Sequence, residues 1–164
     1  MRGGPRSGCP INAAVEALGD PWSLIVLRDI IFGDRRYFRE LLSSSEEGIA
    51  SNVLSSRLKS LVAGGLLVRE EAARGQRARY SLTEAGIRTL PVLAALGTWG
   101  RAHRPGTPEL QVRMELLEEG GPAMVAELMD ELRALHLGTQ LPETDGPRAS
   151  ERLRTAYEAA TAAE

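Results

Sequence analysis

Cysteine occurs once in the 164 residues, as Cys9, and Pro10 follows it directly. Because proline is tolerated at the first position of a helix, the pair predicts that Cys9 lies at the start of a helix ending near Leu18. The helix dipole and free N–H groups at such a position favour a thiolate, which raises the reactivity of the thiol. Oxidation would then give a disulfide between two copies, an adduct or a mixed disulfide with a small thiol. The alternative is a small apolar side chain packed where two subunits meet, since cysteine buries readily.

A second set of candidate side chains lies in IASNVLSSRLKSLVAGG, residues 49–65. The leucines of this segment recur at helical spacing, which predicts a helix over residues 50–63 with one buried stripe. At 100° per residue, Asn52, Ser56 and Lys59 fall on the opposite face, and further serines flank them. That face carries small or hydrogen-bonding side chains and no acid, as a helix entering the DNA major groove requires. The alternative is a solvated serine-rich face. The predicted recognition residues are Ser51, Asn52, Ser55, Ser56, Arg57 and Lys59.

Basic residues also gather in a predicted β-hairpin that follows this helix. Residues 66–70 and 79–82 have the pattern of two short strands, and the intervening loop contains Gly75. A flexible basic loop beside a recognition helix can bind phosphates or enter a minor groove, although a basic loop alone is more often simply solvated. The predicted DNA contacts of this wing are Arg74, Gln76, Arg77 and Arg79. Arg35 and Arg36, which precede a predicted short helix at residues 37–43, are predicted to contact the DNA backbone.

Enzymatic chemistry has little support in the sequence. His103 and His136 are too few and too far from Cys9 in the chain to make a convincing zinc site. The chain has no glycine-rich phosphate loop and no GxSxG motif, and nothing near Cys9 supplies a general base. We therefore predict no catalytic activity, no cofactor and no metal.

Charge divides unevenly along the chain. Residues 1–104 contain 15 basic and 10 acidic residues, whereas residues 105–164 contain 5 basic and 12 acidic residues. A basic body with an acidic tail suits a protein whose body meets a polyanion, although compositional drift gives the same imbalance. No apolar run is long enough to span a membrane, and the short polar N-terminus and single cysteine favour a cytoplasmic protein.

The elements that must position these side chains are mostly helical. Helices are predicted over residues 9–18, 21–33, 37–43 and 50–63, followed by the hairpin and a helix from Thr83 to His103 that kinks or restarts at Pro91. This order is that of a winged helix-turn-helix domain. We therefore predict a mainly α fold with a small β-hairpin. Residues 1–104 form the DNA-binding and dimerisation domain, and residues 105–164 form an acidic helical extension.

Seven short motifs in residues 8–103 resemble those of the HxlR-type winged-helix regulators, bacterial relatives of the MarR group. They are "CP", "LGDPWSLIVLRDI", "RRYFREL", "GIASNVLSSRLKSL", "GGLLVRE", "RYSLTEAG" and "LPVLAALGTWG". The resemblance implies a homodimer on a partly palindromic operator, with helix 9–18 and segment 83–103 at the dimer interface. It also implies a sensing role for Cys9, because several members detect electrophiles or oxidants with a cysteine at this position. Ala50 departs from the family, which commonly has a serine N-cap there, so Ser51 must cap the helix one residue later or leave its end weak.

These observations predict a sequence-specific transcriptional regulator, acting as a homodimeric repressor and responsive through Cys9 to oxidants or electrophiles. A small molecule is a further candidate effector. A winged-helix protein–protein module without DNA binding is the alternative. In the extension, Leu128, Leu132 and Leu135 form a stripe that we expect to pack against the dimerisation helices. Its methionines could line a pocket, although apolar helix faces are usually core.

Overall fold

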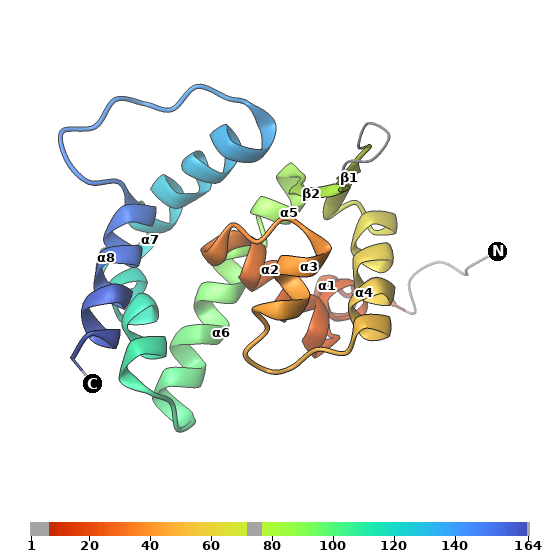
Figure 1. The fold of residues 1–164 in the computed structure, drawn as a ribbon, viewed down its shortest axis with the longest axis horizontal. Coiled ribbons are helices and arrows are strands. Elements are labelled where there is room, and N and C mark those ends of the chain that lie inside the picture. Colours follow the sequence, from red (N-terminus) through yellow and green to blue (C-terminus); the bar gives the residue numbers. More distant parts are fainter. Residues whose placement is uncertain (1–6, 72–76, 164) are drawn as a thin grey trace. The chain divides into compact units, whose positions relative to one another are not determined.

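The computed structural model describes residues 7–71 and 77–163, which divide into two compact units, Met1–Ser81 and Leu82–Glu164 (Figure 1). This division falls at the second strand of the hairpin, ahead of the predicted boundary at residue 104. The assignment of residues 105–164 as a functionally separate extension stays a prediction.

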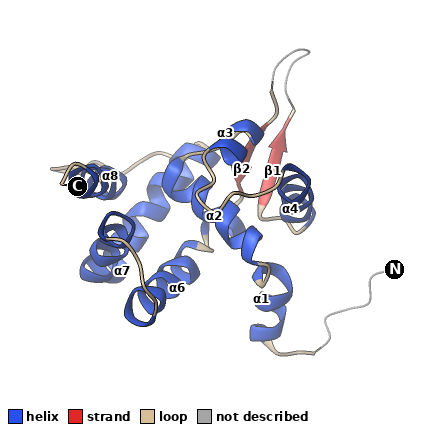
Figure 2. Cartoon of the chain, turned by 60° about the horizontal axis from the view of Figure 1, so that its bottom comes forward, coloured by secondary structure: helices blue, strands red, loops and turns tan. Residues whose placement is uncertain are grey.

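The first unit follows the predicted order of elements. Its helices are α1 (Pro10–Leu18), α2 (Pro21–Gly33), α3 (Phe38–Ser43) and α4 (Ser51–Ala63), and its hairpin is β1 (Leu67–Glu70) and β2 (Arg79–Leu82), which pair in a two-stranded sheet (Figure 2). The mainly helical fold with a small β-hairpin is therefore confirmed.

Local sequence explains where α2 begins and why it is central. The Asp20 side chain accepts a hydrogen bond from the Ser23 N–H at 3.0 Å, and Pro21 supplies a preset backbone angle in the first turn. Leu27 and Ile30 are fully buried. Burying apolar side chains of this size stabilises the fold by about 1.5–3 kcal/mol each, which makes α2 the main support of the unit.

The second unit contains four helices, namely α5 (Glu84–Ile87), α6 (Leu90–His103), α7 (Pro108–Leu137) and α8 (Ala149–Thr161). The Thr83 hydroxyl caps α5 by accepting a hydrogen bond from the Gly86 N–H at 3.0 Å. Pro91 stands in the first turn of α6, so the predicted restart at this proline is confirmed. No helix within the described residues is both long enough and apolar enough to cross a lipid bilayer.

Helix α7 contains a bend at Gly121 and Pro122. Gly121 has φ 59° and ψ −156°, a conformation essentially restricted to glycine, and Pro122 follows it. The residues on either side are helical. The Gly-Pro step therefore divides the 30-residue helix into two halves.

The half of α7 before the bend packs against α6, and α7 also packs against α8. At Gly97 of α6, a Cβ atom would overlap the Met114 sulfur, so the helices approach closely there. Arg101 adds ion pairs to Glu118 at 2.6 Å and Glu115 at 3.3 Å. The first half of α7 therefore packs on α6, whereas the packing of the Leu128, Leu132 and Leu135 stripe against the dimerisation helices stays a prediction.

The leucine stripe of the extension is only partly buried. Leu128 and Leu132 are buried as expected, whereas Leu135 keeps about half of its surface exposed, at 49%. The apolar stripe is therefore shorter than the sequence spacing predicts.

Candidate nucleic-acid interface

Helix α4 presents the polar face that its sequence predicts. Leu54, Leu58 and Leu61 are buried, with at most 2% of their surface exposed. The opposite face carries Asn52 and Lys59, both exposed. The exposed residues of this face are Ser51, Asn52, Ser56, Lys59 and Ser60, and the half-buried polar ones are Ser55 and Arg57. This row can reach a flat or grooved partner without displacing core residues.

The start of α4 has no side-chain cap. Ala50 occupies the N-cap position with extended backbone angles, and Ser51 is already the first helical residue. Of the two predicted outcomes, a cap from Ser51 or a weakly capped helix start, the structure shows the second. The first-turn N–H groups therefore lack a side-chain acceptor and carry the positive end of the helix dipole outward.

Arg57 ties α4, the predicted recognition helix, to the start of α2. Its guanidinium lies 3.2 Å from Asp20 Oδ2, and it also donates a hydrogen bond to the Ser56 hydroxyl at 3.2 Å. Asp20 thus caps α2 with one oxygen and holds α4 with the other. A DNA contact by Arg57 requires release of this ion pair.

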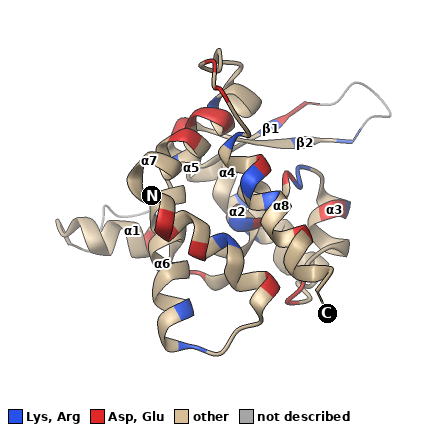
Figure 3. Cartoon of the chain, turned by 90° about the vertical axis from the view of Figure 1, so that its left-hand side faces the viewer, with Lys and Arg blue, Asp and Glu red and all other residues tan. Residues whose placement is uncertain are grey.

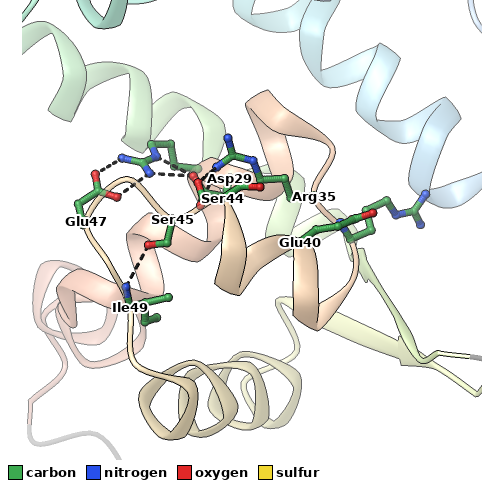
Figure 4. A network of polar contacts seen from close by, with 9 residues as sticks. Asp29, Arg35, Glu40, Ser44, Ser45, Glu47 and Ile49 are labelled. Atoms are coloured by element: carbon green, nitrogen blue, oxygen red, sulfur yellow. Dashed lines mark hydrogen bonds and ion pairs between the residues drawn. The ribbon is translucent and has the colours of Figure 1, made fainter.

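A polar network between α2 and the turn after α3 fixes the connection of α3 to α4 (Figure 4). Arg28 donates to Asp29 at 2.8 Å and to both oxygens of Glu47, at 2.5 and 2.9 Å. Arg35 lies 3.3 Å from Asp29 and donates to the Ser44 carbonyl at 2.7 Å. The hydrogen bond from Arg28 lowers the pKa of the Glu47 carboxyl. These charged contacts add to the apolar packing of the buried Leu41, Ile49 and Leu54 in holding the helix-turn-helix.

Asp29 was not predicted as a site residue, although its side chain is only 5% exposed. The sequence does contain a signal for it, because an acid within the apolar run "LIVLRDII" needs a cationic partner when its neighbours are buried. Its structural role is to receive both Arg28 and Arg35.

Arg36 is buried, which argues against its predicted contact with the DNA backbone. Its guanidinium donates to the Tyr80 carbonyl at 3.2 Å, to the Ser81 hydroxyl and to Glu70 at 3.3 Å. Because Arg36 is buried and its donors are already used, it is poorly placed to bind a DNA phosphate. Arg35 is half-buried and occupied by Asp29 and Ser44, so it supports the turn.

The wing is fastened to the rest of the first unit by Glu70. This carboxylate accepts hydrogen bonds from Ser81 and from Arg79, the latter at 2.8 Å, and these bonds lower the pKa of Glu70. The Tyr80 N–H donates to the Arg36 carbonyl at 2.8 Å, which joins β2 to the segment before α3. Arg79 therefore braces the base of the wing while keeping 45% of its side chain exposed.

Closer to the wing tip, Arg77 is exposed. The predicted contacts Arg74 and Gln76 lie outside the described residues. Figure 3 marks the basic and acidic positions along the ribbon. Within residues 7–71 and 77–163, no ion pair occupies Arg39, Lys59, Arg69 or Arg77, whereas the other described basic residues of the first unit have acidic partners. These four cations of the first unit are therefore candidates for contacts with phosphates.

Cys9 is the N-cap of α1, as its position before Pro10 predicts, and its side chain is exposed. Its N–H donates to the Ser7 hydroxyl at 3.3 Å. The histidines and acids of the described residues form no group of three that could hold a metal ion.

Two helices expose apolar side chains in rows at helical spacing. On α1, Ile11 and Val15 are 73% and 57% exposed, and no residue of this helix is buried. On α6, Val92, Leu96 and Trp99 are 44%, 47% and 52% exposed. Contiguous exposed apolar rows of this kind mark interaction surfaces more often than scattered single residues do.

Comparison with known proteins places this geometry among transcription regulators. Residues 17–107 match the family model described as HxlR-like helix-turn-helix. An uncharacterised HTH-type transcriptional regulator of Mycobacterium tuberculosis is 37% identical over 109 residues, which cover 65% of this chain and 67% of that protein. The regulator YybR of Bacillus subtilis, also uncharacterised, is 29% identical over 60% of this chain and 78% of its own length.

Solved structures agree with this family match. The crystal structure of PA1607, a proposed transcription factor, superposes with a TM-score of 0.56 at 32% identity and covers 63% of this chain and 70% of the other. A proposed MarR-family regulator from Porphyromonas gingivalis W83 has a TM-score of 0.52 at 24% identity over 62% of this chain and 99% of its own, a similarity of fold. The matched residues 17–107 include α2 to α6, and hence the recognition helix and the hairpin.

Proposed function

The chain belongs to the HxlR-like helix-turn-helix family and is a transcriptional regulator rather than an enzyme, and we propose that it acts as a homodimer that represses promoters by binding a partly palindromic operator. The observation that carries this proposal is the exposed, acid-free face of α4. A dimer seated on a promoter excludes polymerase, which is why we propose repression. Operator DNA lies in the bacterial cytoplasm, and we place the protein there.

We propose that the row Asn52, Ser56 and Lys59 at the centre of the exposed face of α4 recognises the bases. The Asn52 amide can donate to and accept from one adenine edge, and Ser56 lies one turn further along the same face. Lys59, a full two turns from Asn52, suits a phosphate or a guanine edge. Ser51 and Ser55 flank the row and allow the helix backbone to approach the groove.

Phosphate contacts are proposed for the wing. Arg77 is exposed and has no described ion pair, whereas Arg79 is held by Glu70 and contributes only its exposed edge. Arg57 contributes if Asp20 releases it. Arg35 and Arg36 are left out of the proposed contacts because the structure engages both internally.

The proposed homodimer uses the apolar rows of α1 and α6. Each row exposes large apolar side chains to water. Burying about three of them per subunit on dimerisation would stabilise the dimer by several kcal/mol. A two-fold axis makes the same patch serve both subunits and places two recognition helices about one DNA turn apart.

A footprint tests the proposal directly. Purified protein is titrated onto DNA upstream of its own and neighbouring genes, and protection is mapped by nuclease cleavage. We expect two protected half-sites with centres about 10 base pairs apart. Equal affinity for operator and random DNA would contradict sequence-specific binding. Capture of a protein partner without any DNA binding would instead favour the alternative of a winged-helix protein–protein module.

We also propose that Cys9 senses oxidants or electrophiles, because its exposed thiol begins the helix that carries Ile11 and Val15. An adduct at this position would disturb the apolar row of α1 and so change the spacing of the recognition helices. Operator affinity is measured with and without diamide or a quinone, in wild type and Cys9→Ser. We expect loss of binding in wild type alone. Wild-type binding that is indifferent to both reagents would assign Cys9 to packing.

A further inference from the structure

A pocket of about 470 Å³ lies in the second unit where α7 bends, between α7 and α8. Its volume falls within the range of about 300–1,000 Å³ typical of sites for small organic ligands. Leu116, Ala123 and Met124 supply apolar lining from both halves of α7. Met124 is buried and forms the floor, whereas Ala123 is exposed at the mouth.

Backbone geometry shapes the wall of this pocket. At Gly120 a Cβ atom would come within 2.6 Å of both the Met124 Cβ and its sulfur, so the helix backbone there lies directly against the floor. Gly121 then turns the chain through a left-handed conformation before Pro122 restarts the helix. Only glycine at position 120 lets Met124 lie this close to the backbone and form the floor of the pocket.

The charges at the rim favour a positive ligand. Arg152 is 2.7 Å from Glu127 Oε2, and Glu127 Oε1 accepts the Ala149 N–H at 2.9 Å, so these two side chains neutralise each other. Glu119 lines the same pocket, is exposed, and makes no hydrogen bond or ion pair within the described residues. Its charge interacts with Arg101, but that cation already pairs with Glu115 and Glu118, so acidic groups remain in excess. Residues 82–164 contain 13 acidic and 8 basic residues, which adds to the negative potential. An anion would meet repulsion here.

We propose that this pocket binds an amphipathic organic cation, with its apolar body on Leu116, Ala123 and Met124 and its positive charge beside Glu119. The part of α7 that carries Leu116 and Glu119 also carries the contacts with α6. Glu115 and Glu118 pair with Arg101, and Met114 packs on Gly97. Occupation of the pocket therefore shifts α7 against α6, and through α6 it changes the dimer. This second step rests on the proposed dimeric, DNA-binding function, whereas the binding site itself does not.

Two ions of the same shape and opposite charge test the site. Tetraphenylphosphonium and tetraphenylborate are titrated separately into the full-length protein and followed by isothermal titration calorimetry. We expect saturable binding of the cation at one site per chain, and at least about tenfold weaker binding of the anion. Equal affinities would overturn the charge argument, and no binding of the cation would overturn the site.

Variants locate the binding to this pocket. Ala123→Trp fills the mouth from an exposed position and is expected to abolish cation binding. Glu119→Gln should weaken it by about fivefold, whereas Glu143→Gln removes the same charge from an exposed loop and should leave it unchanged. Circular dichroism confirms that each variant is folded. Cation binding that survives Ala123→Trp in a folded protein would place the ligand elsewhere and overturn the proposal.

The coupling is measured on operator DNA after the direct binding is known. Saturating tetraphenylphosphonium should change operator affinity in wild type and not in Ala123→Trp. Binding of the cation with unchanged operator affinity would overturn the coupling to α6 alone. If the protein binds no operator, the proposed function fails, and the calorimetric result still decides whether the pocket is a cation site.

Discussion

Helices α4 and α6 have nearly the same length, 13 and 14 residues, and expose opposite kinds of surface. The outer face of α4 is made of serine, asparagine and lysine, whereas that of α6 carries Val92, Leu96 and Trp99. Water solvates the first face well and the second poorly. The difference indicates a polar, hydrated partner for α4 and a protein partner for α6.

Both units use arginines to hold carboxylates. In the second unit, Arg101, Arg133 and Arg152 join different helices and Arg88 pairs with Glu84 one turn away, whereas Arg104 and Arg148 have no ion pair among the described residues. In the first unit, several cations remain without a described partner. An ion-paired arginine stabilises its own unit, whereas one without a partner is available for an external anion.

The largest effect is expected when the apolar face of α6 receives a charge. Leu96→Asp places a carboxylate in the proposed dimer interface, where burial of an unpaired charge is strongly unfavourable. We expect the dimer dissociation constant to rise at least about 100-fold, measured by analytical ultracentrifugation. Ala159→Asp, at an exposed position of α8, is the control and should have no effect. A dimer that persists in Leu96→Asp would exclude the α6 row from the interface.

On α4 the largest effect is expected from Asn52. Asn52→Ala removes a bidentate base contact, so discrimination at one base pair of each half-site should fall by about 1–3 kcal/mol. The measurement compares affinities for operators that carry single base changes. Retained preference at every position would assign recognition to other side chains of α4.

A smaller and more uniform loss is expected from Lys59→Ala or Arg77→Ala. Removing one phosphate contact should weaken operator and random DNA alike, by about fivefold each. Arg154→Ala removes the same charge from α8 and serves as the control. A loss confined to the operator would show that Lys59 or Arg77 contacts a base edge.

The smallest effect concerns the ion pairs of the second unit. Hydrogen bonds from Arg133 and Arg88 lower the pKa of Glu84 from its ordinary 4.5 to about 2. A carboxyl whose pKa is depressed on folding contributes stability above its unfolded pKa and loses it as the pH falls through the folded pKa. Wild type should therefore melt above Glu84→Gln at pH 7, and the gap should close between pH 4.5 and 2. Glu151→Gln should give no comparable pH-dependent gap.

Much of the fold follows from the sequence because each element has local signals. Asp20 and Pro21 start α2, Thr83 caps α5, and the leucine spacing of α4 defines its buried face. The Gly-Pro step in the extension likewise predicts two helices, which the structure joins at Gly121. Such signals depend on residues within one or two turns of each other.

The roles of individual arginines depend on distant partners and could not be predicted in this way. Arg35 and Arg36 are neighbours, yet Arg36 meets Glu70 and Ser81, 34 and 45 residues later, whereas Arg35 meets Asp29. Nothing local distinguishes the two guanidinium groups. The predicted backbone contacts therefore included two side chains that the fold already uses.

The internal ion pairs of the first unit also set how the protein should respond to salt. Each phosphate neutralised by a protein cation releases condensed counterions from DNA, and the slope of log affinity against log salt is about −0.9 per contact. Arginines that keep their carboxylate partners release none. With Arg39, Lys59, Arg69 and Arg77 as the described cations of the first unit without an ion pair, a dimer would have a slope no steeper than about −7 from these residues. The buried Arg36 thus makes the complex more tolerant of salt than the count of basic residues implies.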